Sequence, residues 1–160
     1  MTEEFDLRRF HLSHEGHGPG SSFDVALEEI RQGRKKTHWM WYVFPQLRLG
    51  TSDHSVKYAI NGADEAIAYL NDPVLRNRLL EIALATAEQL AAGADPDSLM
   101  GGNADCTKLR SSMTLFDVAS ASCGDEEIRE VCRRVLELLA ATGIGPCPMT
   151  LKMLADPYIS

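Results

Sequence analysis

The sequence lacks a closely spaced pair of cysteines of the kind that zinc and redox motifs require. The four cysteines stand at positions 106, 123, 132 and 147, so no pair has the C-x-x-C spacing. We expect reduced thiols, with Cys132 packed as a small hydrophobic side chain. The stretch Met1 to Phe10 is charged rather than apolar, and no apolar run approaches the ~20 residues of a membrane span. These absences argue against secretion and membrane insertion and favour a cytoplasmic protein.

An excess of positive charge is also missing. The formal net charge is −7, which argues against nucleic acid and anionic membranes as partners, because both require a cationic protein surface. A small cationic pocket remains compatible with this charge, since Arg31, Arg34, Lys35 and Lys36 lie close together in the chain. The partner that we expect is therefore an anionic small molecule. The oligomeric state does not follow from the sequence.

Familiar cofactor and catalytic motifs are absent from the sequence. It has no glycine-rich phosphate loop, no G-x-S-x-G elbow, no H-E-x-x-H motif and no EF-hand loop, so we expect no cofactor. His11, His14 and His17 recur every three residues, and a helix would place their imidazoles on one face as metal ligands. Because Gly16 and Gly18 disfavour a helix there, a solvated helix end is the simpler interpretation, and a metal site is the weaker alternative.

The apolar residues recur at helical spacing along most of the chain. With 160 residues, 44% of them hydrophobic, the chain suits one domain, and we predict a single all-α domain of about seven to nine helices without a substantial sheet. Residues 1–4 and 157–160 are expected to be flexible ends. The predicted helices cover about 5–12, 23–32, 56–60, 63–70, 73–92, 96–100, 106–119, 126–141 and 150–155. The predicted N-caps are Ser21 or Ser22, Asp72, Asp95, and Asn103 or Asp105.

The stretch RKKTHWMWYVFPQ, residues 34–46, combines cations, an imidazole and both tryptophans of the protein. Residues 39–44 favour a strand by propensity. However, no second segment offers a partner strand, and a lone strand would leave its backbone groups unpaired. We therefore expect a buried helical turn or an irregular segment, which Pro45 ends.

The same stretch carries the first candidate binding chemistry. Lysines neutralise phosphate groups, indole and phenol rings stack on bases, and an imidazole transfers protons near neutral pH. The candidates for these roles are Lys35, Lys36, Trp39, Trp41, Tyr42 and His38. In the alternative interpretation the aromatic residues are core and the lysines form its solvated edge.

A second candidate lies in the predicted helix over residues 105–116, DCTKLRSSMTLF. Leu109, Met113 and Phe116 share the predicted core face. The cationic and hydroxyl side chains on the other faces lie near the helix start, where free backbone N–H groups favour a phosphate or carboxylate. These are Lys108, Arg110, Ser111, Ser112 and Thr114. Alternatively, a residue such as Arg110 only pairs with Asp117 or with a nearby helix.

Both stretches resemble a known family. GRKKTHWMWYVFPQL, then KYAI with EAIAYLNDPVLRNRL, and then KLRSSMTLF resemble the bacterial family of domains of unknown function DUF1810, some members of which are labelled calpastatin-like. The resemblance runs from Phe5 to about Leu154 and implies a single, mainly helical domain with no established activity. The sequence departs from the family pattern between Glu15 and Gly20 and before Leu109. A looser similarity links it to small helical proteins that bind or hydrolyse ADP-ribose-type groups.

These observations give one working hypothesis and one alternative. In the first, a pocket between the two stretches binds a phosphate-bearing nucleotide-like or ADP-ribose-like ligand. Lys36, Lys108 and Arg110 hold the anion with Ser111 and Ser112, Trp39 or Trp41 stacks, and His38 or Asp105 transfers protons in an N-glycosidic or similar hydrolysis. In the alternative, the protein is a non-enzymatic helical interaction module, in which Trp39, Trp41 and Phe44 are core.

Overall fold

The structure, a computed structural model, describes residues 5–155 and confirms the predicted all-α fold. The described residues form ten helices: α1 (Arg8–His14), α2 (Phe23–Arg31), α3 (Met40–Val43), α4 (Asp53–Lys57), α5 (Ala63–Asn71), α6 (Pro73–Ala91), α7 (Pro96–Met100), α8 (Asn103–Cys123), α9 (Glu126–Ala140) and α10 (Pro148–Ala155). The number exceeds the predicted seven to nine because the aromatic segment forms a helical turn, α3. Within this range β-structure is limited to one isolated parallel bridge between Leu47 and Ile60. The predicted flexible ends at 1–4 and 157–160 lie outside the described residues.

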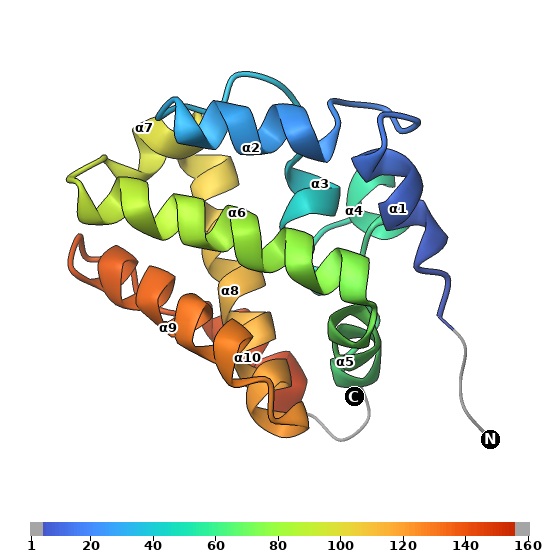
Figure 1. Ribbon diagram of the computed structural model, residues 1–160. Coiled ribbons are helices and arrows are strands. Elements are labelled where there is room, and N and C mark those ends of the chain that lie inside the picture. Colours follow the sequence, from blue (N-terminus) through green and yellow to red (C-terminus); the bar gives the residue numbers. More distant parts are fainter. Residues whose placement is uncertain (1–4, 156–160) are drawn as a thin grey trace.

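Helix α6 lies at the centre of one compact domain. Figure 1 shows α2, α6 and α9 one beneath the next, with α8 passing behind them, and both α2 and α9 pack against α6. Helix α8 in turn packs against α5, α7, α9 and α10. The short helices α1, α3 and α4 gather at one end of this arrangement. None of the helices between residues 5 and 155 has the length and apolar character that crossing a membrane requires.

The predicted core faces are buried. Leu109, Met113 and Phe116 on α8 have no exposed surface, and the Phe116 ring packs against Tyr69 with centroids 5.3 Å apart. Cys132 on α9 is a free thiol with no exposed surface, as expected for a small hydrophobic side chain. The helical spacing of apolar residues thus identified the surfaces that meet in the core.

The predicted N-caps are confirmed at three helices. Ser22, Asp72 and Asp95 each accept a hydrogen bond from a backbone N–H in the first turn of α2, α6 and α7. Pro73 and Pro96 follow two of these caps at the first helical position, where the missing N–H has no helical partner to lose. These ends are set by groups a few residues apart, so the sequence sufficed to place them.

Several helices start elsewhere than predicted. Helix α1 begins at Arg8 rather than near residue 5. Helix α8 begins at Asn103 with Gly102 as its N-cap, so neither Asn103 nor Asp105 caps it. Gly101 and Gly102 have φ values of 79° and 148°, which let the chain reverse directly before α8. Helix α4 starts earlier than the predicted 56–60, because the Ser52 hydroxyl accepts a hydrogen bond from Ser55 N and caps a helix at that point.

Candidate functional site

A buried carboxylate on α2 holds the loop that leads to the tryptophans. Glu29 Oε1 accepts hydrogen bonds from Lys36 N at 2.7 Å, Thr37 N at 3.0 Å and Trp39 Nε1 at 2.9 Å. Its Oε2 accepts from Thr37 Oγ1 at 2.6 Å. Burial alone would raise the pKa of Glu29, but these donors outweigh it and lower the pKa to about 2. The carboxylate is therefore ionised at neutral pH and fixes the course of residues 36–39.

Lys35 reaches into the molecule from this loop. Its backbone N–H donates to Leu99 O at 2.8 Å, which fastens the loop to the end of α7. Its Nζ donates to Thr37 O at 2.6 Å, lies 2.9 Å from Asp105 Oδ2, and lies 5.0 Å from the centroid of the Trp39 ring. Only 6% of the side chain is exposed. A buried ammonium group of this kind requires its paired carboxylate.

A second lysine holds the other oxygen of the same carboxylate. Lys108, one turn further along α8, has its Nζ 3.2 Å from Asp105 Oδ1 and 4.5 Å from the centroid of the Trp41 ring. Burial would raise the pKa of Asp105, but Lys35, and after it Lys108, lower it below its ordinary value. The side chains of Trp39, Lys35, Asp105, Lys108 and Trp41 thus form one continuous network, which we call the Lys–Asp–Lys network.

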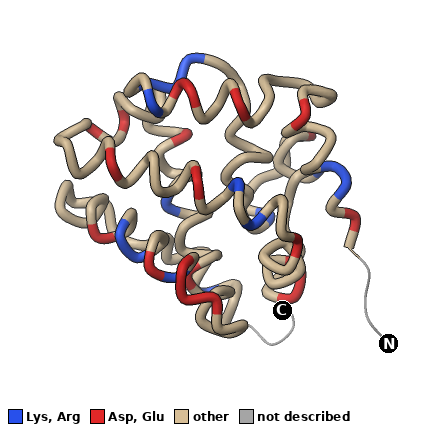
Figure 2. Tube along the Cα trace, in the orientation of Figure 1, with Lys and Arg blue, Asp and Glu red and all other residues tan. Residues whose placement is uncertain are grey.

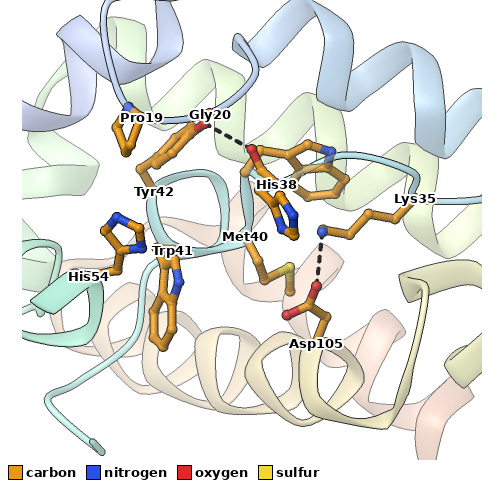
Figure 3. A pocket seen from close by; sticks show the side chains of 10 residues that line it. Pro19, Gly20, Lys35, His38, Met40, Trp41, Tyr42, His54 and Asp105 are labelled. Atoms are coloured by element: carbon orange, nitrogen blue, oxygen red, sulfur yellow. Dashed lines mark hydrogen bonds and ion pairs between the residues drawn. The ribbon is translucent and has the colours of Figure 1, made fainter. Parts of the chain in front are cut away.

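This network lies at a pocket of about 330 Å³, a size at the lower end of small-molecule sites. Figure 3 shows Lys35 and Asp105 facing each other on one side and Trp41 beside His54 on the other. The lining residues are Pro19, Gly20, Lys35, His38, Trp39, Met40, Trp41, Tyr42, His54 and Asp105. The pocket adjoins the basic loop between α2 and α3, because Lys35 of this loop is one of its lining residues. Figure 2 shows the Lys and Arg residues of this loop close together along the chain.

Close backbone packing closes the pocket beside His38. Tyr42 Oη donates to Ser21 O at 2.6 Å and lies 3.2 Å from His38 O. Burial raises the pKa of Tyr42 to about 12, so its hydroxyl remains a donor. A Cβ atom at Gly20 would overlap the carbonyl oxygen of His38, so the chain can approach this closely only at a glycine.

Several residues that the sequence indicated do meet at this pocket. His38 is exposed at its rim, Trp41 is partly buried in its wall, and Asp105 faces it from α8. Trp39 also borders the pocket, but only 1% of it is exposed and its indole N–H is bonded to Glu29. Trp41 is consequently the better placed of the two tryptophans to stack on a ligand.

Other predicted ligand-binding residues lie elsewhere. Lys36 is exposed and lies outside the residues that line the pocket, a position that Lys35 occupies instead. Arg110 lines a separate hollow, with Nη1 3.4 Å from Gly145 O. Ser111 and Ser112 are buried, and Ser111 Oγ donates to a backbone carbonyl of α8 itself. The structure therefore does not bring Lys36 and Arg110 together around one anion.

Sequence reasoning missed Glu29 and His54. The available signal for Glu29 was its place beside the apolar stripe of the helix over 23–32, where a carboxylate requires hydrogen-bond donors. His54 carries no local signal, because it reaches the pocket through the packing of α4 against the aromatic segment, where the Tyr42 and Tyr58 rings lie 5.3 Å apart.

The three N-terminal histidines have separate contacts. His11 Nε2 lies 2.7 Å from Asp72 Oδ2, whereas His14 is buried and its Nε2 donates to Tyr42 O at 2.6 Å. His17 is exposed. Among residues 5–155, no group of three or more His, Cys, Asp or Glu side chains is arranged to hold a metal ion. The metal interpretation of this spacing thus gains no support, and His14 is not part of a solvated helix end.

Comparisons with other proteins place the chain in a family. A family model described as "Protein of unknown function (DUF1810)" matches residues 4–144. Among solved structures, the chain is similar to the conserved hypothetical protein Rv1873 from Mycobacterium tuberculosis, with 36% identity and a TM-score of 0.77. The similarity covers 95% of this chain and 98% of that one. A search of curated proteins gives no match.

Proposed function

Because the chain belongs to the DUF1810 family of proteins of unknown function, we propose its function from the pocket itself: it binds a small ligand with a phosphate-bearing, nucleotide-like or ADP-ribose-like group. The observation that carries this proposal is the Lys–Asp–Lys network at the pocket beside Trp41. Neither lysine alone would support it.

The charge of the pocket suits an anion. Two ammonium groups and one carboxylate leave one net positive charge in a protein whose formal net charge is −7. The partly enclosed position of the lysines strengthens their attraction for a phosphate, because solvent screens it less than at an open surface. Lys108 is not among the residues that line the pocket, but its Nζ contacts two that do, Asp105 and the Trp41 ring. Its side chain is 20% exposed, so an anion of a ligand beside Trp41 would be within its reach.

The aromatic lining suits a planar group. Trp41 is partly buried in the wall, and His54 and Met40 line the same pocket. Stacking of a base on an aromatic side chain contributes about 1–3 kcal/mol and requires no particular base. A ring beside Trp41 with its phosphate toward Lys108 would use both kinds of contact.

A second candidate function is hydrolysis of an N-glycosidic bond in such a ligand. The pairing of an ionised carboxylate, Asp105, with an exposed imidazole, His38, in one pocket favours it. In this reaction water adds across the bond, and the carboxylate stabilises the positive charge that develops on the sugar. Incubation with NAD or nucleoside monophosphates and chromatographic detection of free base would test it, with His38→Asn expected to slow release.

The binding proposal is tested by thermal shift with AMP, NAD and ADP-ribose, and with adenosine as the ligand that lacks phosphate. A ligand at 100 times its dissociation constant stabilises the protein by about 2.7 kcal/mol. Lys108→Gln should reduce the shift, whereas Lys152→Gln, an exposed lysine on α10, should leave it unchanged. If none of the phosphate-bearing compounds raises the melting temperature at millimolar concentration, the proposal is wrong.

The alternative function, a non-enzymatic interaction module, is based on the tryptophan motif at residues 39–44. Trp39 and Phe44 are each 1% exposed, which agrees with a role of the tryptophan motif in the core. Trp41 distinguishes the two functions, since it is partly buried and borders the pocket. Under the alternative function, Trp41 contributes to packing alone. Replacing it would then change the stability of the protein and would not change the binding of any nucleotide.

A further inference from the structure

Asp105 pairs with both lysines of the Lys–Asp–Lys network. Its two carboxylate oxygens each contact a different ammonium group, Lys35 Nζ at 2.9 Å and Lys108 Nζ at 3.2 Å. A phosphate or carboxylate of a ligand presents oxygens of the same kind to lysine. The protein's own carboxylate therefore competes with the ligand for the positive charge of the pocket.

The two lysines differ in how firmly they are held. Lys35 is 6% exposed and also donates to Thr37 O, so its ammonium group is fixed by two acceptors. Lys108 is 20% exposed, contacts Asp105 at the longer distance, and lies over Trp41 at the pocket wall. Lys108 can thus turn toward a ligand while Lys35 keeps Asp105 in place.

We propose that Asp105 acts as an internal competitor for the ligand's phosphate, and that Lys108 is shared between Asp105 and that phosphate. This inference rests on the proposed binding function and names the residue that limits its affinity. The competition makes the pocket selective by charge: a ligand with a doubly charged phosphate displaces the carboxylate from Lys108, whereas a ligand with a weaker anion does not.

The test is the affinity of Asp105→Asn for AMP, with adenosine as the uncharged probe. Removing the competing charge at hydrogen-bond distance from Lys108 should tighten AMP binding about tenfold, because unit charges a few ångströms apart interact strongly in a partly enclosed site. The side-chain oxygen of the introduced asparagine and Thr37 O remain as acceptors for the buried Lys35 ammonium group. Adenosine affinity should stay unchanged. Asp64→Asn, which removes an exposed carboxylate on α5, is the matched control for net charge and should leave AMP affinity unchanged.

Intrinsic tryptophan fluorescence can be used to measure the affinity for AMP. A lysine of the Lys–Asp–Lys network lies over the ring of each tryptophan, so intrinsic fluorescence reports changes in the network directly.

A double variant tests the role of Lys108. In Asp105→Asn combined with Lys108→Gln, the gain in AMP affinity should vanish, because the shared ammonium group is gone. A gain that persists in the double variant would overturn the role given to Lys108.

Failure of the inference and failure of the binding function give different results. If the wild type binds AMP and a folded Asp105→Asn variant binds it equally or more weakly, the competition is wrong and the binding function stands. If neither protein binds any phosphate-bearing probe, both are wrong. Should Asp105→Asn fail to give the wild-type circular dichroism spectrum, Asp105→Ser removes the same charge with a smaller side chain, and the same comparison decides the outcome.

Discussion

The indole N–H of Trp39 donates a hydrogen bond to Glu29 Oε1 at 2.9 Å, so one of the two tryptophans that the sequence offered for ligand stacking is bonded to a carboxylate on α2. The same carboxylate accepts hydrogen bonds from the backbone N–H groups of Lys36 and Thr37. One side chain therefore sets both the depth of Trp39 and the path of the loop that carries Lys35. The pocket depends on this bond although Glu29 does not line it.

Replacing Glu29 by Gln should destabilise the protein by about 2–4 kcal/mol, because hydrogen bonds to a charged acceptor contribute about 1.5–3 kcal/mol each and an amide retains only some of them. Urea unfolding followed by circular dichroism measures the free energy of unfolding. Glu28→Gln is the matched control, since Glu28 is the exposed neighbour on α2 and should change stability little. Equal effects of the two substitutions would contradict the role of Glu29.

Acid should weaken the same contact in a defined range of pH. The pKa of Glu29 is about 2 in the folded protein and 4.5 in its ordinary state, so the unfolded chain takes up the proton first as the pH falls. The contribution of Glu29 to stability is present above pH 4.5 and is lost progressively between pH 4.5 and about 2. The free energy of unfolding of Glu29→Gln should therefore fall less steeply than that of the wild type across this interval.

His14 should produce a separate loss of stability at higher pH. Burial lowers its pKa from 6.5 to about 4, although the hydrogen bond to Tyr42 O opposes this shift. The folded state thus keeps His14 neutral where the unfolded chain protonates it, and stability falls as the pH drops from 6.5 to about 4. The expected loss is about 3 kcal/mol. The free energy of unfolding, measured at several pH values between 6.5 and 4, should fall in this way for the wild type and not for His14→Asn.

The two tryptophans should respond differently to alanine. Trp39 is 1% exposed, and Trp39→Ala should lower the free energy of unfolding by about 3–5 kcal/mol. Trp41 is partly buried in the pocket wall, and Trp41→Ala should lower it by only about 1–2 kcal/mol while reducing the thermal shift by AMP. Unchanged AMP binding in a folded Trp41→Ala variant would contradict the stacking role given to Trp41.

Gly20 should tolerate no side chain. A methyl group there would overlap His38 O, and the strain should destabilise Gly20→Ala by about 1–3 kcal/mol and weaken AMP binding by displacing the loop beside His38. Gly145→Ala is the control, because a Cβ at Gly145 would meet open space among residues 5–155. The melting temperatures of the two variants are measured with and without AMP. Only Gly20→Ala should melt at a lower temperature than the wild type and show a smaller shift with AMP.

Most of the fold could be predicted because its signals are local. The apolar spacing in the helices over 73–91 and 126–140, and the caps at Asp72 and Asp95, involve residues a few positions apart, so short windows of sequence sufficed. The role of Asp105 could not be predicted, for the opposite reason. Asp105 was considered both as a local cap and as a proton-transfer group, but its partner Lys35 comes from a distant loop, which no window around residue 105 contains.

The sequence by itself determined that the chain is helical, that it belongs to its family, and that residues 34–46 and 105–116 carry the cationic and aromatic groups of interest. Only the tertiary structure decided which of them meet. Lys35 rather than Lys36 enters the pocket because its N–H is bonded to Leu99 O, and Arg110 lies toward a different hollow on α8. Adjacent lysines are equivalent in a sequence, whereas long-range hydrogen bonds and helix packing distinguish them in space.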